Sequence, residues 1–181
     1  MNDLALHILD IVQNSISAGA LLIRIIVSEN LIKDLLSITI EDNGKGMTEE
    51  QVSKLADPFF TSRTTRKVGM GIPLFKQSAE QSGGKLNIKS EVGIGTTITA
   101  TFIYSNIDRP PLGDVANAVI ILVTSNPNIR FVFEYSFNHK KYIFDTKEVK
   151  EALEDLPINT PGIAKYLEEM VKENMKEARE S

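Results

Sequence analysis

The sequence predicts an α+β fold in which helices cover one face of a sheet. Residues 3–20 place apolar side chains at three- and four-residue steps, as an amphipathic helix does. Residues 22–28 and 37–41 are rich in β-branched side chains, and residues 85–91 and 96–104 alternate polar with apolar positions around a Val-Gly-Ile-Gly turn. The order of elements is therefore helix, two strands, short helix, loop, helix and hairpin.

The ends of the two later helices in this region are marked by local signals. Thr48 and Gln51 have the spacing of a capping box, which predicts a short helix after the second strand. Pro73 suits the first turn of another helix, which stops at the glycine pair 83–84. Residues 57–71 lie between these helices and concentrate Gly, Thr and basic side chains without any period. A long loop inside a compact domain usually has a function.

Two consecutive prolines, Pro110 and Pro111, follow Arg109 and interrupt regular structure. They suggest a division of the chain into residues 1–104 and 105–181. In the second part we expect a helix over 113–125, strands over 129–137 and 141–144, and two helices of mixed charge. The last helix carries an apolar stripe at helical spacing, formed by Ile163, Leu167, Met170 and Val171. Two interpretations stay open: an accessory layer packed on the sheet, or a module that uses this stripe to dock a partner or to dimerise.

Composition excludes several classes of site and partner. The 181 residues contain no cysteine, so a disulfide framework, a thiolate zinc site and a catalytic thiol are excluded. A formal net charge of -4 argues against a nucleic-acid surface. No apolar run approaches the roughly 20 residues that a bilayer requires, and the start of the chain does not resemble a leader. We expect a soluble cytoplasmic protein.

Four polar residues share one face of the first helix. His7, Asp10, Asn14 and Ser17 are spaced three, four and three residues apart. A carboxylate and a carboxamide one turn apart suit a hydrated Mg²⁺ ion and a water molecule. A solvated side of an amphipathic helix is the alternative interpretation.

The segment DNGKGM follows the second strand. Asp42 stands where the strand ends, and Gly44 and Gly46 would let the backbone approach a flat ligand without a Cβ atom between them. Taken alone, the segment is equally typical of a common Asp-Asn-Gly turn.

A third group of candidate residues lies in the long loop. Gly69 and Gly71 directly precede a helix, whose first backbone amides can bind phosphate. Arg63, Arg66 and Lys67 place positive charge in the same loop of an acidic chain.

Together these segments resemble a known superfamily. The runs HILDIVQNSISAGA, EDNGKGM, DPFFTSR and KVGMGIPLFKQSAEQSGGKLNIKSEVGIGTTITATF, in this order, are similar to the N, G1, F and G2 boxes of the histidine kinase-like (GHKL) ATPases. The resemblance implies the Bergerat fold over residues 1–104, a two-layer α/β sandwich with a small α/β extension behind it. ATP or ADP with Mg²⁺ would lie between the helices, under a mobile lid.

The resemblance also implies roles for individual residues. Asp10 and Asn14 would be the catalytic pair, with Asn14 as the ligand of Mg²⁺. Asp42 would bond the adenine amino group, and Thr96 would support a water molecule linked to adenine. The other positions assigned to the nucleotide are Gly44, Gly46, Met47, Phe59, Arg63, Lys67, Gly69, Met70 and Gly71.

Three positions depart from the pattern of the superfamily. Lys67 replaces a glycine, and Ser17 stands where many sensor kinases carry a lysine. Hydrolysing members carry Glu at the place of Asp10, and Asp is one methylene shorter. A general base that falls short of its water loses a large part of its rate, so we expect slow hydrolysis.

Three functions are compatible with such a pocket, because phosphoryl transfer mainly requires positioning and charge neutralisation. The first is a protein kinase acting in trans on a protein partner, similar to anti-sigma factor kinases or to the catalytic part of a two-component system. The others are a slow ATPase that works as a conformational switch and a non-enzymatic ATP or ADP sensor. We expect no acceptor domain ahead of residue 3, and we expect His7 to be packed or to line the pocket. His139 falls in a predicted turn, so we expect no autophosphorylation in cis. A homodimer is compatible with each function, and neither nucleic acid nor a membrane is expected as a partner.

Overall fold

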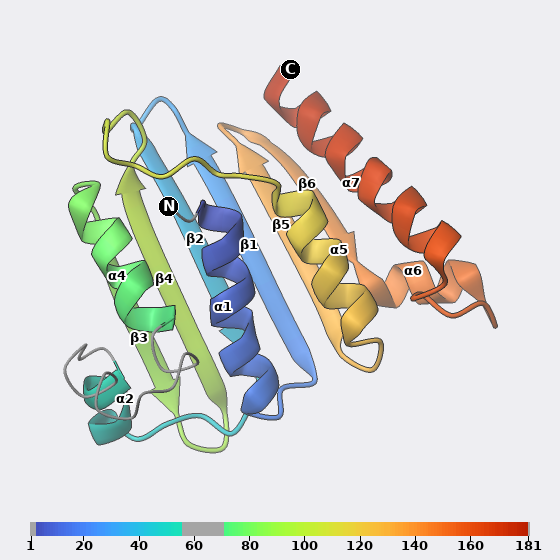
Figure 1. The fold of residues 1–181 in the computed structure, drawn as a ribbon, viewed down its shortest axis with the longest axis horizontal. Helices are drawn as coiled ribbons and strands as arrows, with labels where there is room; N and C mark the ends of the chain where they lie inside the picture. Colours follow the sequence, from blue (N-terminus) through green and yellow to red (C-terminus); the bar gives the residue numbers. More distant parts are fainter. Residues whose placement is uncertain (1–2, 56–70, 181) are drawn as a thin grey trace.

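A computed structural model describes residues 3–55 and 71–180. Its centre is one mixed six-stranded sheet, and α1, α4, α5 and α7 lie on the same side of it (Figure 1). The elements in chain order are α1 Leu4–Ser17, β1 Leu22–Asn30, β2 Leu35–Asp42, α2 Glu49–Leu55, α4 Gly71–Gln81, β3 Lys85–Glu91, β4 Gly95–Ile103, α5 Val115–Ser125, β5 Arg130–Phe137, β6 Lys140–Asp145, α6 Thr146–Leu153 and α7 Pro161–Glu180. The α+β prediction, with helices on one face of the sheet, is confirmed.

Capping hydrogen bonds mark the starts of α1 and α2. Asp3 caps α1 by accepting from the backbone N–H of Leu6 at 2.9 Å. The capping box before α2 is complete: Gln51 Oε1 accepts from the N–H of Thr48, and Thr48 Oγ1 accepts from the N–H of Gln51. β1 and β2 are each longer than predicted, because a tight turn at 31–34 joins them and lets the ladder run to its end.

The strand order is β3-β4-β2-β1-β5-β6. β1 and β5 pair in parallel, and the other neighbours are antiparallel. A parallel neighbour requires a crossover connection, and the segment containing α5 provides it. Residues 105–181 therefore extend the sheet of the first part at its β1 edge.

The core lies between the sheet and its helices. Alternate residues of β1, β2, β4 and β5 point into it, as period-2 alternation requires, and α1, α4 and α5 cover them. The largest fully buried side chains include Tyr135, Phe75, Phe102, Phe131 and Phe133. Two of these aromatic residues precede residue 105 and three follow it, so the two parts share one core.

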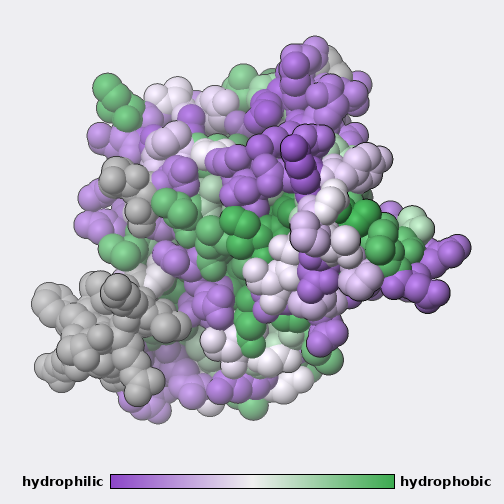
Figure 2. All heavy atoms as spheres, turned by 45° about the vertical axis from the view of Figure 1, so that its right-hand side comes forward, coloured by the Kyte–Doolittle hydropathy of each residue, from purple (hydrophilic) through white to green (hydrophobic). Residues whose placement is uncertain are grey.

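The apolar stripe of α7 belongs to this core. Leu167 and Val171 are 3% and 0% exposed, and Ile163 and Met170 pack against them and their neighbours. α7 contacts α5, β5 and β6, and hydrophilic side chains dominate the upper part of the surface on this side (Figure 2). The chain itself therefore covers the centre of the stripe, which favours the interpretation as an accessory layer packed on the sheet.

His7 is packed between α1 and α4, as expected. Its side chain is 3% exposed, its ring lies 5.2 Å from that of Phe75, and its Nε2 is 3.0 Å from Ser78 Oγ. Nδ1 has no hydrogen-bond partner among the described residues. Burial lowers the pKa of His7 below its ordinary value of 6.5, outweighing the opposing effect of Asp10 and Asp3.

We expect this burial to make stability depend on pH. The unfolded chain binds a proton at His7 before the native protein does, so the full stability is present above the unfolded pKa and declines as pH falls below about 6.5. Chemical unfolding at pH 7.5, 6.5 and 5.5 measures the effect. His7→Gln should flatten this part of the profile, whereas His139→Gln, at an exposed turn, should leave it unchanged. A native-like profile in His7→Gln would contradict the assignment.

No helix in the described part of the chain is both long enough and apolar enough to cross a membrane.

Candidate functional site

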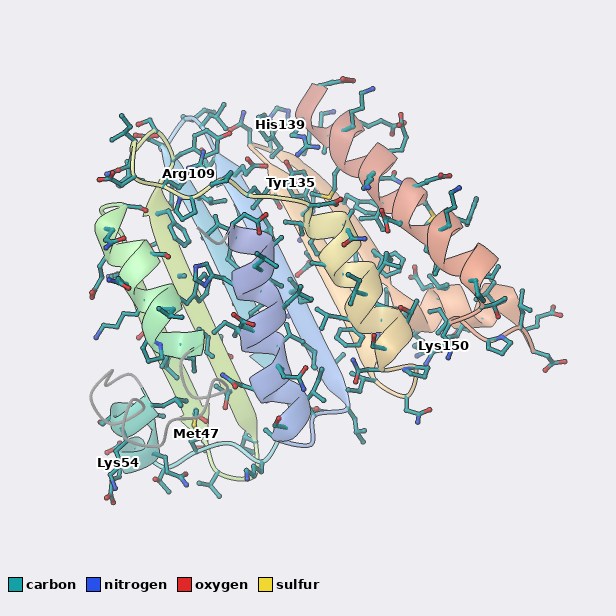
Figure 3. The ribbon with its side chains drawn as sticks, in the orientation of Figure 1. Met47, Lys54, Arg109, Tyr135, His139 and Lys150 are labelled. Carbon is teal, nitrogen blue, oxygen red and sulfur yellow. The ribbon has the colours of Figure 1, made fainter. Side chains whose placement is uncertain are left out.

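A cavity of about 220 Å³ lies between the C-terminal half of α1 and the end of the sheet. Met47 marks this end of the molecule in Figure 3, near α2. The cavity is lined by Asn14, Ser15, Ser17, Ala18, Asp42, Lys45, Gly46, Met47, Leu55, Ile72, Thr96 and Ile98. Five of the residues predicted from the sequence therefore meet at one place: Asn14, Asp42, Gly46, Met47 and Thr96.

The carboxylate of Asp42 is held in a fixed position. Ser15 Oγ donates to its Oδ2 at 2.6 Å, and the backbone N–H of Gly44 donates to its Oδ1 at 2.9 Å. These two charge-assisted hydrogen bonds set the direction of the carboxylate. Asp42 thus offers the cavity an oriented hydrogen-bond acceptor.

The loop after Asp42 is wedged between α1 and the β3–β4 turn. The N–H of Lys45 donates to the carbonyl of Ala18 at 3.0 Å, and the N–H of Gly93 donates to the carbonyl of Lys45 at 2.7 Å. At Gly46, where φ is +72°, a Cβ atom would lie 2.0 Å from the carbonyl oxygen of Glu91. The glycine is therefore required by the protein's own backbone, a reason that differs from the expected approach of a flat ligand.

Asn14 reaches the cavity from α1 and is half-buried. Its amide nitrogen is buried and has no hydrogen-bond partner within residues 3–55 and 71–180. Buried polar groups are normally paired, so this amide nitrogen is available to donate a hydrogen bond to a ligand. In the described residues no group of three or more His, Asp or Glu could hold a metal ion by itself. The site suits Mg²⁺ nevertheless, because Mg²⁺ commonly takes few protein ligands and completes its shell with phosphate and water.

Thr96 lies opposite Asp42 in the ladder between β2 and β4. It is 8% exposed, and its Oγ1 is 2.7 Å from Ser90 Oγ on the neighbouring strand β3. The side chains of Asp42 and Thr96 thus form adjacent polar points of the cavity wall.

Comparison with known proteins shows which family the chain belongs to. Residues 2–105 match the family described as histidine kinase-, DNA gyrase B-, and HSP90-like ATPase. The chain belongs to this ATPase family. The match covers the segments that carry Asn14, Asp42 and Thr96.

Several curated members of the family resemble this ATPase chain. The non-motile and phage-resistance protein of Caulobacter vibrioides is 30% identical over 111 residues, which are 56% of this chain and 13% of that protein. A probable C4-dicarboxylate sensor kinase of Bacillus subtilis is 35% identical over 79 residues, 44% of this chain and 15% of that protein. Histidine protein kinase SaeS of Staphylococcus aureus is 33% identical over 84 residues, 44% of this chain and 24% of that protein. The aligned segments thus span at most about a quarter of these relatives.

Solved structures show the same fold. The N-terminal domain of a DNA repair protein aligns with a TM-score of 0.57 and 20% identity, over 79% of this chain and 52% of that one. The MutL ATPase domain of Aquifex aeolicus, complexed with ADP, aligns with a TM-score of 0.52 and 14% identity, over 84% and 69%.

Asp10 lies outside the cavity wall. It is exposed, and it stands beside the start of α4, where a Cβ atom on Gly71 would be 3.5 Å from its own Cβ. The predicted polar face of α1 is divided: His7 enters the core, Asp10 faces outward, and Asn14 and Ser17 line the cavity. Spacing along a helix could not show this, because the position of α4 decides which polar residues it covers.

Five positions predicted to bind nucleotide lie outside the described residues: Phe59, Arg63, Lys67, Gly69 and Met70. Gly44 is described and lies behind the cavity wall, where an added Cβ atom would be 2.8 Å from Ala18 Cβ.

Sequence reasoning missed two residues of the site, Ser15 and Ser90. Ser15 directly follows Asn14, and the Val-Gly-Ile-Gly turn sets residue 90 opposite residue 96, so the register of the hairpin was the signal for Ser90.

Proposed function

We propose that the cavity binds ATP with Mg²⁺ and that the chain is a protein kinase which phosphorylates a partner protein in trans. The observation that carries the proposal is the presence, in one cavity, of a fixed carboxylate and a carboxamide whose nitrogen is unpaired. Asp42 is oriented by Ser15 and Gly44, and the side-chain amide nitrogen of Asn14 has no hydrogen-bond partner among the described residues. Membership of the ATPase family supplies the class of ligand.

Each residue has a separate task in this proposal. Asp42 accepts a hydrogen bond from the exocyclic amino group of adenine, and Thr96 bonds the neighbouring water. The amide oxygen of Asn14 would hold Mg²⁺, which would neutralise charge on the phosphates. Lys45 lines the same cavity and adds a positive charge near the nucleotide.

The location of the two histidines supports transfer in trans. His7 is buried in the core and engaged with Ser78. His139 lies in the exposed turn between β5 and β6, at the end of the sheet opposite Met47 (Figure 3). Neither imidazole faces the cavity, so the phosphoacceptor is proposed to lie on another chain. The similarity to sensor kinases favours this branch of the family.

A slow ATPase switch is the second candidate, supported by the acidic Asp10 one turn before Asn14. Incubation with γ-labelled ATP separates the candidates. Label that appears on a co-purified protein selects the kinase, and steady phosphate release without acceptor selects the ATPase. Tight binding with neither outcome selects a non-enzymatic ATP or ADP sensor.

We expect nucleotide selectivity to depend on Asp42. Mg²⁺-ATP should raise the thermal midpoint, because a ligand at 100 times its Kd stabilises the native state by about 2.7 kcal/mol. Mg²⁺-GTP should raise it much less, since guanine presents a carbonyl to the carboxylate. Differential scanning fluorimetry of the native protein and Asp42→Asn measures this, and the variant should lose most of the difference between ATP and GTP. Equal shifts for ATP and GTP in the native protein would refute adenine recognition.

A further inference from the structure

Ser90 holds together three parts of the wall behind the cavity. Its Oγ accepts from the backbone N–H of Met47 at 2.8 Å. The same oxygen lies 3.1 Å from the carbonyl oxygen of Gly95 and 2.7 Å from Thr96 Oγ1. Ser90 does not line the cavity, but it is hydrogen-bonded to two residues that do, the backbone of Met47 and the side chain of Thr96.

Strand register places these side chains in a row. Asp42 on β2 pairs with Thr96 on β4, and Thr96 pairs with Ser90 on β3. All three point to the side of the sheet that the helices cover, because they continue the alternation of buried residues along their strands. The row begins at the carboxylate and ends at the hydroxyl of Ser90.

The positions of the hydroxyl protons follow from the donors and acceptors in this row. A hydroxyl has one proton and two lone pairs, a backbone N–H can only donate, and a carbonyl can only accept. All three contacts of Ser90 are hydrogen bonds in a single arrangement: Ser90 donates to Gly95, and accepts from both Met47 and Thr96. The proton of Thr96 then points away from the cavity.

We propose that Ser90 is a positioning residue for base specificity, which acts by drawing the proton of Thr96 out of the cavity. Both oxygens of Asp42 accept hydrogen bonds, and Thr96 presents only lone pairs. This end of the cavity is therefore a wall of acceptors. It matches the amino group of a 6-aminopurine and leaves the oxygen of a 6-oxopurine without a donor. The inference rests on the proposed binding of ATP and names what makes that site selective.

Calorimetric titration with Mg²⁺-ATP and Mg²⁺-ITP tests this role. ITP differs from ATP at the 6-position, where it carries a carbonyl, and at the adjacent ring nitrogen, where it carries a proton. In Ser90→Ala the hydroxyl of Thr96 is free to donate into the cavity, so the ratio of the Kd for ITP to the Kd for ATP should fall about five- to tenfold, the equivalent of one neutral hydrogen bond. Ser90→Thr keeps the hydroxyl and should keep the native ratio.

The decisive control removes the group through which Ser90 acts. In a Thr96→Val background, Ser90→Ala should leave the ITP to ATP ratio unchanged within twofold. A ratio that is native-like in Ser90→Ala, or that falls equally in the Thr96→Val background, would overturn the inference and leave Ser90 as an anchor of the Met47 backbone. If Ser90→Ala does not fold, Ser90→Cys replaces it, and the same fall in the ratio of the Kd for ITP to the Kd for ATP is expected. A thiol fills the space of the hydroxyl and is only a weak hydrogen-bonding group.

The same titrations separate this inference from the proposed function. A native protein that binds neither nucleotide overturns the proposed function and the inference with it. A native protein that prefers ATP, together with an unchanged ratio in Ser90→Ala, overturns the role of Ser90 alone.

Discussion

A Gly46→Ala variant is expected to lose roughly 10 °C in thermal midpoint and its response to ATP. The added Cβ would lie 2.0 Å from the carbonyl oxygen of Glu91 and 2.6 Å from its carbonyl carbon, and φ at this position is +72°. Neither neighbour is the end of a flexible side chain, so the loop itself must move. Such a backbone clash costs on the order of 3–5 kcal/mol, and each kcal/mol shifts the midpoint of a domain of this size by about 2–4 °C.

Gly93→Ala is the matched control for the clash. Gly93 also has a positive φ, of +81°, but a Cβ there meets nothing within 4 Å. It should cost only the strain of the left-handed conformation, about 1–2 kcal/mol. Thermal melts of both variants, with and without Mg²⁺-ATP, make the comparison. Equal midpoints for Gly46→Ala and Gly93→Ala would show that the clash is relieved without cost.

An Asn14→Ala variant is expected to abolish stabilisation by Mg²⁺-ATP while leaving the free protein as stable as before. The buried amide nitrogen of Asn14 has no partner in the described part of the protein, so its removal breaks no hydrogen bond recorded there. Deleting an unsatisfied buried polar group is close to neutral for folding. The ligand, in contrast, would lose the side chain proposed to hold Mg²⁺.

Asp10→Asn on the same helix provides the contrast. Asp10 is exposed and lies outside the cavity wall, so binding of Mg²⁺-ATP should remain nearly intact. Thermal shifts over a series of nucleotide concentrations, with Mg²⁺ and with EDTA, compare the two variants. If Asn14→Ala keeps the native shift in Mg²⁺, the metal assignment is wrong, and if it lowers the midpoint of the free protein, Asn14 has a structural task as well.

The sequence by itself was sufficient to predict the local helices and strands and to identify the motifs. The period of α1, the capping box at Thr48 and the hairpin after residue 85 all depend on residues close together in the chain, and each is present in the structure. The motif residues Asn14, Asp42 and Thr96 could be chosen because the segments that carry them resemble those of the histidine kinase-like ATPases. The structure brings them to one cavity.

Tertiary structure alone decided what covers each buried face. An apolar stripe on α7 indicates that one side is buried, but the pattern is the same whether α5 and the sheet or another protein provides the cover. The parallel pairing of β5 with β1, which joins residues 105–181 to the first sheet, likewise depends on a long connection that no local pattern describes. The same holds within the site. The hydrogen bond from Ser15 to Asp42 joins side chains 27 positions apart, and the separation of His7 from Asp10 depends on where α4 packs, because contacts between distant segments are set by how the elements pack together.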